Sequence, residues 1–269
     1  MANRKETSVL VVAGETGSGK STFIEGLFSL MQNVLEPTLW IDTTLDCGIL
    51  RKLKGESSLK PFQGASLYET LVQVQAQKLM PSAEVDWHLA ETPYTIQGHH
   101  EAISFYPSHH PNHPPNQQEA DWVHQTDALL NEVCVQKALR YGWSRLLSKN
   151  YRYVIMNIGN ASLVEALLPK LNVSLLYLCT PSQSADTDTL YTFTCMGHWH
   201  SLNVLMTQAH HRSVLDESWQ TWLQENPSWQ FLGRLPYFNS DADWHQGYQT
   251  HLKNSLARLN WDGVKALSR

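Results

Sequence analysis

Eight consecutive residues leave few folds open to this chain. Gly14-Glu15-Thr16-Gly17-Ser18-Gly19-Lys20-Ser21 matches the pattern G-x-x-x-x-G-K-[ST] without a mismatch. The segment before it, Ser8 to Ala13, is a continuous apolar, β-branched run (SVLVVA), which predicts a strand buried on both faces. The segment after it places Phe23, Leu27, Leu30 and Met31 at helical spacing, which predicts a helix beginning near Ser21. A strand, a glycine-rich loop and a helix therefore follow one another in that order.

This order is the one that phosphate binding requires. The glycines allow backbone N–H groups to turn inward around phosphate oxygens, and the positive end of the helix dipole faces the same place. Lys20 supplies a positive charge to the β and γ phosphates, and the Ser21 hydroxyl is a ligand for Mg²⁺. We therefore predict that Gly14 to Thr22 bind a nucleoside triphosphate, with ATP and Mg²⁺ as the expected pair.

Strands and helices are predicted to alternate along most of the chain. The predicted strands, besides Ser8 to Ala13, are Thr38 to Asp42, Trp87 to Leu89, Ala102 to Tyr106, Tyr153 to Met156, Ser174 to Cys179, Asn203 to Met206 and Trp229 to Leu232. The later predicted helices are Ser66 to Met80, Glu119 to Ser148, Ala161 to Leu168, Ser184 to Cys195, Leu215 to Gln224 and Asp241 to Leu259. Alternation of this kind favours a mainly parallel sheet between two helical layers. We predict a three-layer α/β/α fold of the phosphate-loop NTPase class, in one domain over residues 1–269.

The proline-rich stretch Pro107 to Gln118 (PSHHPNHPPNQQ) is predicted to be a loop insertion. Histidines gather in and near it, including His99 and His100, without the spacing of a metal site, which favours solvated histidines. Asp186 and Asp188 favour the start of a helix. For Trp219 and Trp222, core packing is favoured over a surface that binds a partner.

Charge and composition limit the classes of partner. The formal net charge of −5 disfavours binding to DNA through Lys and Arg, although a local basic patch would permit it. No stretch approaches the roughly 20 apolar residues that a membrane-spanning helix needs. The four cysteines have no metal-type spacing and are expected to be reduced, which favours the cytoplasm.

This chain lacks the motifs that are typical of two other classes of phosphate-loop protein, the GTPases and the nucleotide kinases. A GTPase would carry N/T-K-x-D after a late strand, but Thr207-Gln208-Ala209-His210 stands at that place. A nucleotide kinase would carry an arginine-rich lid, but the segment from Cys179 to Phe193 has no arginine. Guanine specificity is therefore disfavoured, and a small-molecule phosphotransferase is kept as an alternative function.

Several segments, taken in order, resemble the ParA/MinD family of dimerising ATPases. They are the phosphate loop and the segments LWIDTTLDCGIL, SLYETLVQV, YRYVIMNIGNAS, LLYLCTPSQSADTDTLY, NVLMTQA and FLGRLPYFNSD. The resemblance covers roughly Val9 to Leu50 and Tyr151 to Asp241. It implies a nucleotide switch that dimerises or binds a protein partner to position or regulate a larger machine, as in secretion, cellulose synthesis, partition or division.

The resemblance also implies roles for particular residues. Lys20 and Ser21 would hold the phosphates and Mg²⁺, and Asp42 would lie in the switch region near the metal and the attacking water. Gln208 and the segment Gly233 to Tyr237, which includes Pro236, would lie near the adenine base.

Three positions depart from the family pattern. Glu15 stands where the family's signature lysine is expected, and Thr44 stands where a second aspartate positions water, although Asp46 lies close by. Asn157 replaces the Walker B aspartate, so it would face Mg²⁺ without a negative charge. The residues therefore leave two alternatives open, namely an ATPase with Lys20, Asp42 and Asp46 as catalytic residues, and a catalytically weakened nucleotide-binding scaffold.

Overall fold

The computed structural model describes residues 6–44, 66–77, 94–105, 117–147, 151–159, 163–164, 172–196, 199–210, 213–236 and 247–267. The chain divides into two structural units that interleave along the sequence. Unit 1 comprises Met1–Thr7 and Leu35–Lys170, and unit 2 comprises Ser8–Val34 and Leu171–Arg269. The prediction of a single domain stays a prediction.

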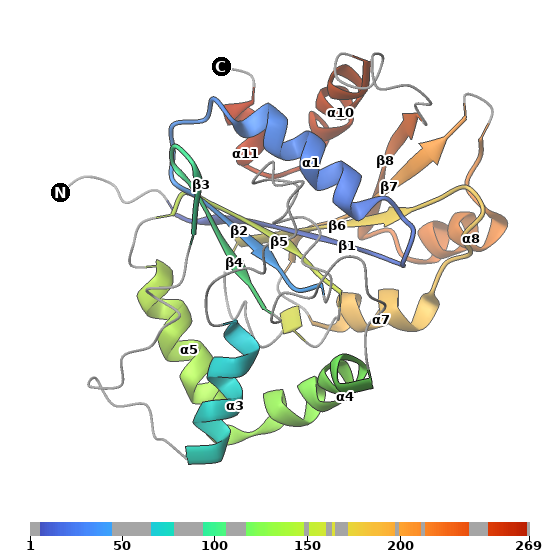
Figure 1. Cartoon of the computed structure of the whole chain (residues 1–269). Helices are drawn as coiled ribbons and strands as arrows, with labels where there is room; N and C mark the ends of the chain where they lie inside the picture. The colour runs from blue at the N-terminus through green and yellow to red at the C-terminus, as the bar shows by residue number, and fades with distance from the viewer. Residues whose placement is uncertain are drawn as a thin grey trace. The chain divides into compact units, whose positions relative to one another are not determined.

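Unit 2 contains four parallel strands in the order β1-β6-β7-β8 (Figure 1). Their bounds are Ser8–Gly14 for β1, Asn172–Cys179 for β6, Trp199–Ala209 for β7 and Trp229–Pro236 for β8. The apolar run of β1 is buried along its whole length, as a strand covered on both faces requires. The register places the end of β1, Gly14, beside Leu178 of β6.

Helices cover both faces of this sheet (Figure 1). On one face lie α1 (Lys20–Met31) and α10 (Gln249–Leu256), and on the other lie α7 (Thr187–Cys195) and α8 (Glu217–Glu225). The side chain of Tyr177 on β6 packs against Phe193 of α7 and Trp219 of α8, with ring centroids 6.3 and 5.6 Å apart. Trp219 is 1% exposed, which confirms its place in the core.

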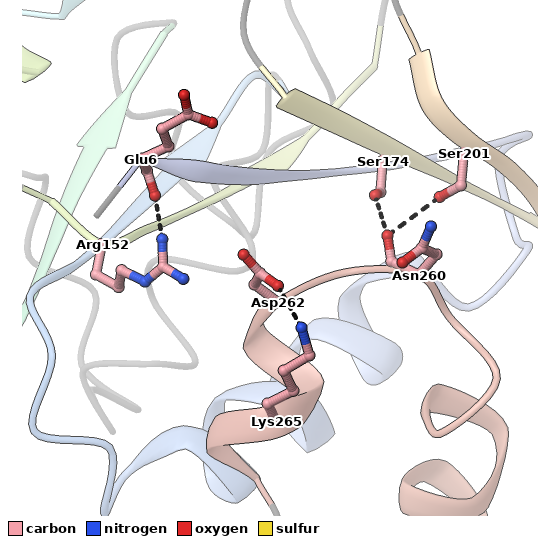
Figure 2. Close-up of polar contacts among 7 residues, drawn as sticks. All are labelled: Glu6, Arg152, Ser174, Ser201, Asn260, Asp262 and Lys265. Carbon is pink, nitrogen blue, oxygen red and sulfur yellow. Dashed lines mark hydrogen bonds and ion pairs between the residues drawn. The ribbon is translucent and has the colours of Figure 1, made fainter. Parts of the chain in front are cut away.

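The last part of the chain is tied to the other face of the same strands. The hydroxyls of Ser174 on β6 and Ser201 on β7 both donate to the backbone carbonyl of Asn260, at 2.7 and 3.4 Å (Figure 2). Residues 174 and 177 differ by an odd number, so their side chains point to opposite faces of the strand. A short helix, α11 (Gly263–Ala266), follows, with an exposed ion pair between Asp262 and Lys265 at 2.9 Å.

Unit 1 contains four strands in the order β3-β4-β2-β5. Their bounds are Tyr94–Gln97 for β3, His100–Ser104 for β4, Thr38–Asp42 for β2 and Tyr153–Asn157 for β5. The β4-β2 and β2-β5 pairs are parallel, and the β3-β4 hairpin is antiparallel. The first residues of the unit join β5, because the Thr7 hydroxyl donates to the Tyr151 carbonyl at 2.9 Å and Arg152 donates to the Glu6 carbonyl (Figure 2).

Three helices of unit 1 pack against one another, namely α3 (Leu67–Gln77), α4 (Gln117–Asn131) and α5 (Val133–Leu147) (Figure 1). A capping box starts α3: the Ser66 hydroxyl accepts from the Glu69 N–H at 3.2 Å, and a carboxylate oxygen of Glu69 accepts from the Ser66 N–H at 2.9 Å. The Tyr68 N–H donates to the Phe105 carbonyl at 2.7 Å, which ties the helix to the residue after β4.

The structure corrects several predicted elements. The predicted helix Glu119 to Ser148 is two helices, because the Glu132 N–H bonds to the Leu129 carbonyl three residues back and a new helix starts at Val133. The first of these helices begins at Gln117, so the predicted loop Pro107 to Gln118 is too long at its end. The predicted helix Asp241 to Leu259 ends at Leu256. Strand β3 was not predicted, and the predicted strand Trp87 to Leu89 lies outside the described residues.

Two predictions about single residues have opposite outcomes. Asp186 is confirmed at a helix start, where its carboxylate caps α7 by accepting from the Thr189 N–H at 3.2 Å. The solvated state predicted for His100 is wrong, since it is 1% exposed at the start of β4. The Trp40 indole N–H donates to its Nδ1 at 3.3 Å, which explains how a histidine is accommodated there.

Candidate functional site

The glycine-rich loop of unit 2 connects the end of β1 to the start of α1. Gly14 requires glycine, because it has φ +143° and a Cβ there would lie 2.4 Å from the Leu178 carbonyl oxygen and 2.7 Å from the Ser18 hydroxyl. Gly17 and Gly19 adopt the left-handed conformation, with φ +81° and +79°. The pattern of glycines thus corresponds to the backbone that the loop adopts.

The start of α1 presents backbone donors to the loop. Its N-cap is Gly19, which provides no side-chain cap, and the first turn has no acidic residue. Helix N-terminal amides without such a cap bind anions, and the helix dipole favours negative charge there. Lys20 lies in the same place, with its ammonium donating to the carbonyls of Gly14 and, at 2.7 Å, Glu15. The residues present fit a phosphate group.

Three side chains outside the loop hold its next three carbonyls. The Gln183 amide donates to the Thr16 carbonyl at 3.3 Å, and the Gln208 amide donates to the Gly17 carbonyl at 2.7 Å. The Thr207 hydroxyl donates to the Ser18 carbonyl at 2.6 Å, with the Cys179 carbonyl 3.2 Å away. Gln183 follows β6, and Thr207 and Gln208 lie near the end of β7. The carboxyl ends of these strands therefore support the loop directly.

Cys179 ends β6 beside this loop and is 1% exposed. Burial, reinforced by the negative charge of Glu15, raises the pKa of its thiol to about 12. Burial, followed by the negative charges of Glu15 and Asp186, raises the pKa of the neighbouring Tyr177 phenol. Cys179 is therefore a neutral thiol at physiological pH and lacks the thiolate character of a nucleophile.

We expect alkaline pH to destabilise the protein through Cys179. The thiol titrates near its ordinary pKa of about 8.5 in the unfolded chain, so the folded state loses stability as the pH rises from there toward 12. Between pH 8 and pH 10.5 the free energy of unfolding should fall by about 2 kcal/mol less in Cys179→Ala than in the wild type. Urea denaturation at both pH values measures this difference. An equal fall in both proteins would contradict the raised pKa.

In unit 1, the register of β2 with β5 pairs Asp42 with Asn157 at the carboxyl ends of the two strands. The Asn157 amide nitrogen donates to Asp42 Oδ1 at 3.0 Å. The same carboxylate oxygen accepts from the Thr44 N–H at 3.0 Å and from the Thr44 hydroxyl at 2.6 Å. Asp42 is 0% exposed and Asn157 is 2% exposed. The carboxylate is thus held by three donors in a buried setting.

The side-chain oxygen of Asn157 is a buried hydrogen-bond acceptor. Because its nitrogen donates to a carboxylate, its oxygen Oδ1 is fixed as an acceptor. This buried oxygen has no hydrogen-bond partner within the described part of the chain. Buried polar atoms rarely stay unsatisfied, and an amide oxygen beside a carboxylate suits a hydrated Mg²⁺ ion. The residues therefore fit the predicted metal.

The predicted site residues are distributed over both units. Unit 2 holds the predicted nucleotide-binding residues, namely Gly14 to Thr22 for the phosphates and, for the adenine base, Gln208 and Pro236, the last residue of β8. Unit 1 brings together Asp42 and Asn157, while Asp46 lies outside the described residues. The Gln208 side chain contacts the phosphate loop, and its predicted place near an adenine base stays a prediction.

Gln183 and Thr207 were not predicted as site residues. One feature of the sequence could have indicated them, because both residues lie directly after or near the end of a predicted strand. Ligands of parallel α/β sheets bind outside the carboxyl ends of the strands. That rule selects a region of the chain without indicating which side chains reach the loop. The contacts themselves become visible only in the fold.

No protein-family model and no curated protein matches this sequence. Solved structures do match. A plasmid partition protein from Borrelia burgdorferi is 15% identical over 94% of this chain and 97% of its own, with a TM-score of 0.59. An ATP complex of a McdA variant from Cyanothece is 14% identical over 98% and 94%, with a TM-score of 0.55. The septum site-determining protein MinD from Pyrococcus horikoshii, complexed with Mg-ADP, is 13% identical over 97% and 93%, with a TM-score of 0.52.

These likenesses establish the fold. The chain has the three-layer α/β/α fold of phosphate-loop NTPases with a mainly parallel sheet, which confirms the predicted fold class. They also confirm, at the level of fold, the resemblance to ParA/MinD proteins. Among the described residues, every helix is too short or too polar to cross a membrane.

Proposed function

We propose that this chain is a divergent nucleotide switch of the ParA/MinD type, which binds ATP with Mg²⁺ through the loop from Gly14 to Ser21. The observation that carries the proposal is the loop itself. Its glycines have positive φ angles, and at Gly14 a side chain would clash with the neighbouring backbone. The start of α1, which has no side-chain cap, supplies N–H donors for phosphates, and Lys20 supplies positive charge.

Mg²⁺ is the proposed partner of the nucleotide. We assign the Ser21 hydroxyl of the loop as a ligand of the ion. In unit 1, the Asn157 Oδ1 atom beside Asp42 is an acceptor of the kind that a hydrated Mg²⁺ ion binds. The ion would supply positive charge that draws electrons from the γ phosphate and positions it for attack by water. In this chain Asn157 contributes a neutral acceptor where a carboxylate would add charge, which predicts weaker retention of the ion.

A second candidate function, a nucleotide-binding scaffold with little or no hydrolysis, is favoured by the surroundings of Asp42. Its Oδ1 accepts three hydrogen bonds from Thr44 and Asn157. Oδ1 is thus already engaged by three donors from the protein, which leaves it less available to take a proton from an attacking water.

Phosphate release separates the two candidates. ATP binding would be measured by calorimetry with MgCl2, and phosphate release in single-turnover and steady-state assays. A switch ATPase should release phosphate in both assays. Tight ATP binding without phosphate release in either assay would support the scaffold and contradict the ATPase. Absence of ATP binding would overturn both candidates.

The proposed partner is another protein or a second copy of this chain. The structural neighbours include a plasmid partition protein and a septum site-determining protein. The formal net charge of −5 favours a protein partner over DNA. Light scattering with and without ATP would reveal a nucleotide-dependent second copy as a doubling of mass.

A further inference from the structure

The carbonyls of Thr16, Gly17 and Ser18 are consecutive along the loop, and each accepts a hydrogen bond from a side chain outside it. The donors are Gln183, Gln208 and Thr207, in that order. The two preceding carbonyls, of Gly14 and Glu15, accept from Lys20 within the loop. Five successive peptide oxygens are thus held in place.

Holding a carbonyl also fixes the N–H of the following residue. A trans peptide is planar, with its oxygen and its amide hydrogen on opposite sides. With the oxygens of Thr16 and Ser18 held by Gln183 and Thr207, the N–H groups of Gly17 and Gly19 point away from these donors. A phosphate loop binds an anion through backbone N–H groups of this kind.

Gln208 adopts an unfavourable backbone conformation at this contact. Its φ is +52°, and it is the one residue other than glycine with a positive φ among the residues that the structure describes. The β7-β8 register shifts between Met206 and Ala209, so the strand is irregular at this place. A left-handed conformation costs a residue with a side chain roughly 1–2 kcal/mol. Such strain persists where the surrounding structure or a function requires it.

We propose that Gln183, Thr207 and Gln208 form a clamp that holds the phosphate loop in its binding shape before the nucleotide arrives. The inference rests on the proposed function of the loop. The three are positioning residues, since they act on the nucleotide through the loop backbone. The clamp lowers the cost of ordering the loop on binding, so its loss weakens nucleotide affinity more than it weakens the fold.

The test measures the affinity for AMP-PNP, which is not hydrolysed, by calorimetry with MgCl2. Gln208→Ala and Gln208→Gly both remove the amide, and each should weaken binding about fivefold, as one net hydrogen bond implies. Thr207→Val keeps the shape and removes the hydroxyl, and should weaken binding about tenfold because the side chain is buried. Thr207→Ser restores the hydroxyl and should restore affinity to within about twofold.

Gln220→Ala is the matched control. The Gln220 amide also donates to a backbone carbonyl, of Leu215 at 2.8 Å, and the residue is exposed on α8. Its loss should leave AMP-PNP affinity within about twofold of the wild type. Thermal unfolding separates an effect on the fold from an effect on nucleotide affinity. Gln208→Gly relieves the left-handed strain, so its Tm should exceed that of Gln208→Ala by about 2 °C while its affinity is no better.

Binding of Gln208→Gly and Thr207→Val at wild-type affinity would overturn the clamp. Failure of the wild type itself to bind AMP-PNP would overturn the proposed function, and the clamp with it. A loss of affinity in the clamp variants, absent from Gln220→Ala, supports the clamp.

Discussion

Lys20→Ala should weaken ATP binding about 100-fold, the largest loss of affinity expected from a single substitution in this chain. Hydrogen bonds to charged groups contribute roughly 1.5–3 kcal/mol each, and charge-assisted contacts to phosphate are the strong ones. Lys20 would contact the β and γ phosphates, so more than one such contact would be lost. Calorimetry with ATP and MgCl2 measures the affinity, and circular dichroism checks that the variant is folded.

In the structure, the Lys20 ammonium makes hydrogen bonds to the loop backbone that compete with binding to phosphate. Its ammonium donates to the carbonyls of Gly14 and Glu15, and at least part of this bonding would be exchanged for phosphate oxygens. The matched control is Lys265→Ala, because Lys265 is 80% exposed and its ion pair with Asp262 lies on the surface. That control should bind ATP as the wild type does. Unchanged affinity in Lys20→Ala would place any bound nucleotide outside the loop.

The sequence was sufficient to predict those elements whose signal is local. The apolar run before Gly14, the glycine spacing and the apolar residues after Thr22 each describe a few neighbouring residues, and β1, the loop and α1 follow them. The match of Thr38–Asp42 with β2 has the same origin. Local patterns of this kind reflect burial and backbone conformation, which act over one element at a time.

The remaining features depend on contacts between distant parts of the chain. The loop carbonyls of Gly17 and Ser18 meet Gln208 and Thr207 across about 190 residues of sequence, and no local pattern encodes that meeting. His100 likewise appeared solvated because its neighbours in sequence are polar, whereas Trp40 on the adjacent strand buries it. The orphaned oxygen of Asn157 became visible only when the β2-β5 register placed its amide nitrogen on Asp42.

Asn157→Asp should destabilise the protein by about 3 kcal/mol without metal and make its stability depend on Mg²⁺. In the wild type, the Asn157 amide nitrogen lies 3.0 Å from Asp42 Oδ1 and donates to it. A carboxylate in its place would turn a hydrogen bond into the contact of two buried acceptors, both negatively charged. Thermal unfolding in EDTA should therefore show a lower Tm than the wild type, by several degrees.

Magnesium should reverse much of this loss, because two buried carboxylates in contact form a better site for a hard cation than one carboxylate and an amide. We expect the Tm of Asn157→Asp to rise with MgCl2 more steeply than that of the wild type. Asn203→Asp is the matched control, since Asn203 is also buried in a strand and its oxygen is also unsatisfied among the described residues. Its amide donates to the Leu175 carbonyl, so the change should destabilise the fold equally with and without MgCl2. If Mg²⁺ raises the Tm of both variants alike, the effect is unspecific and Asn157 does not face the metal.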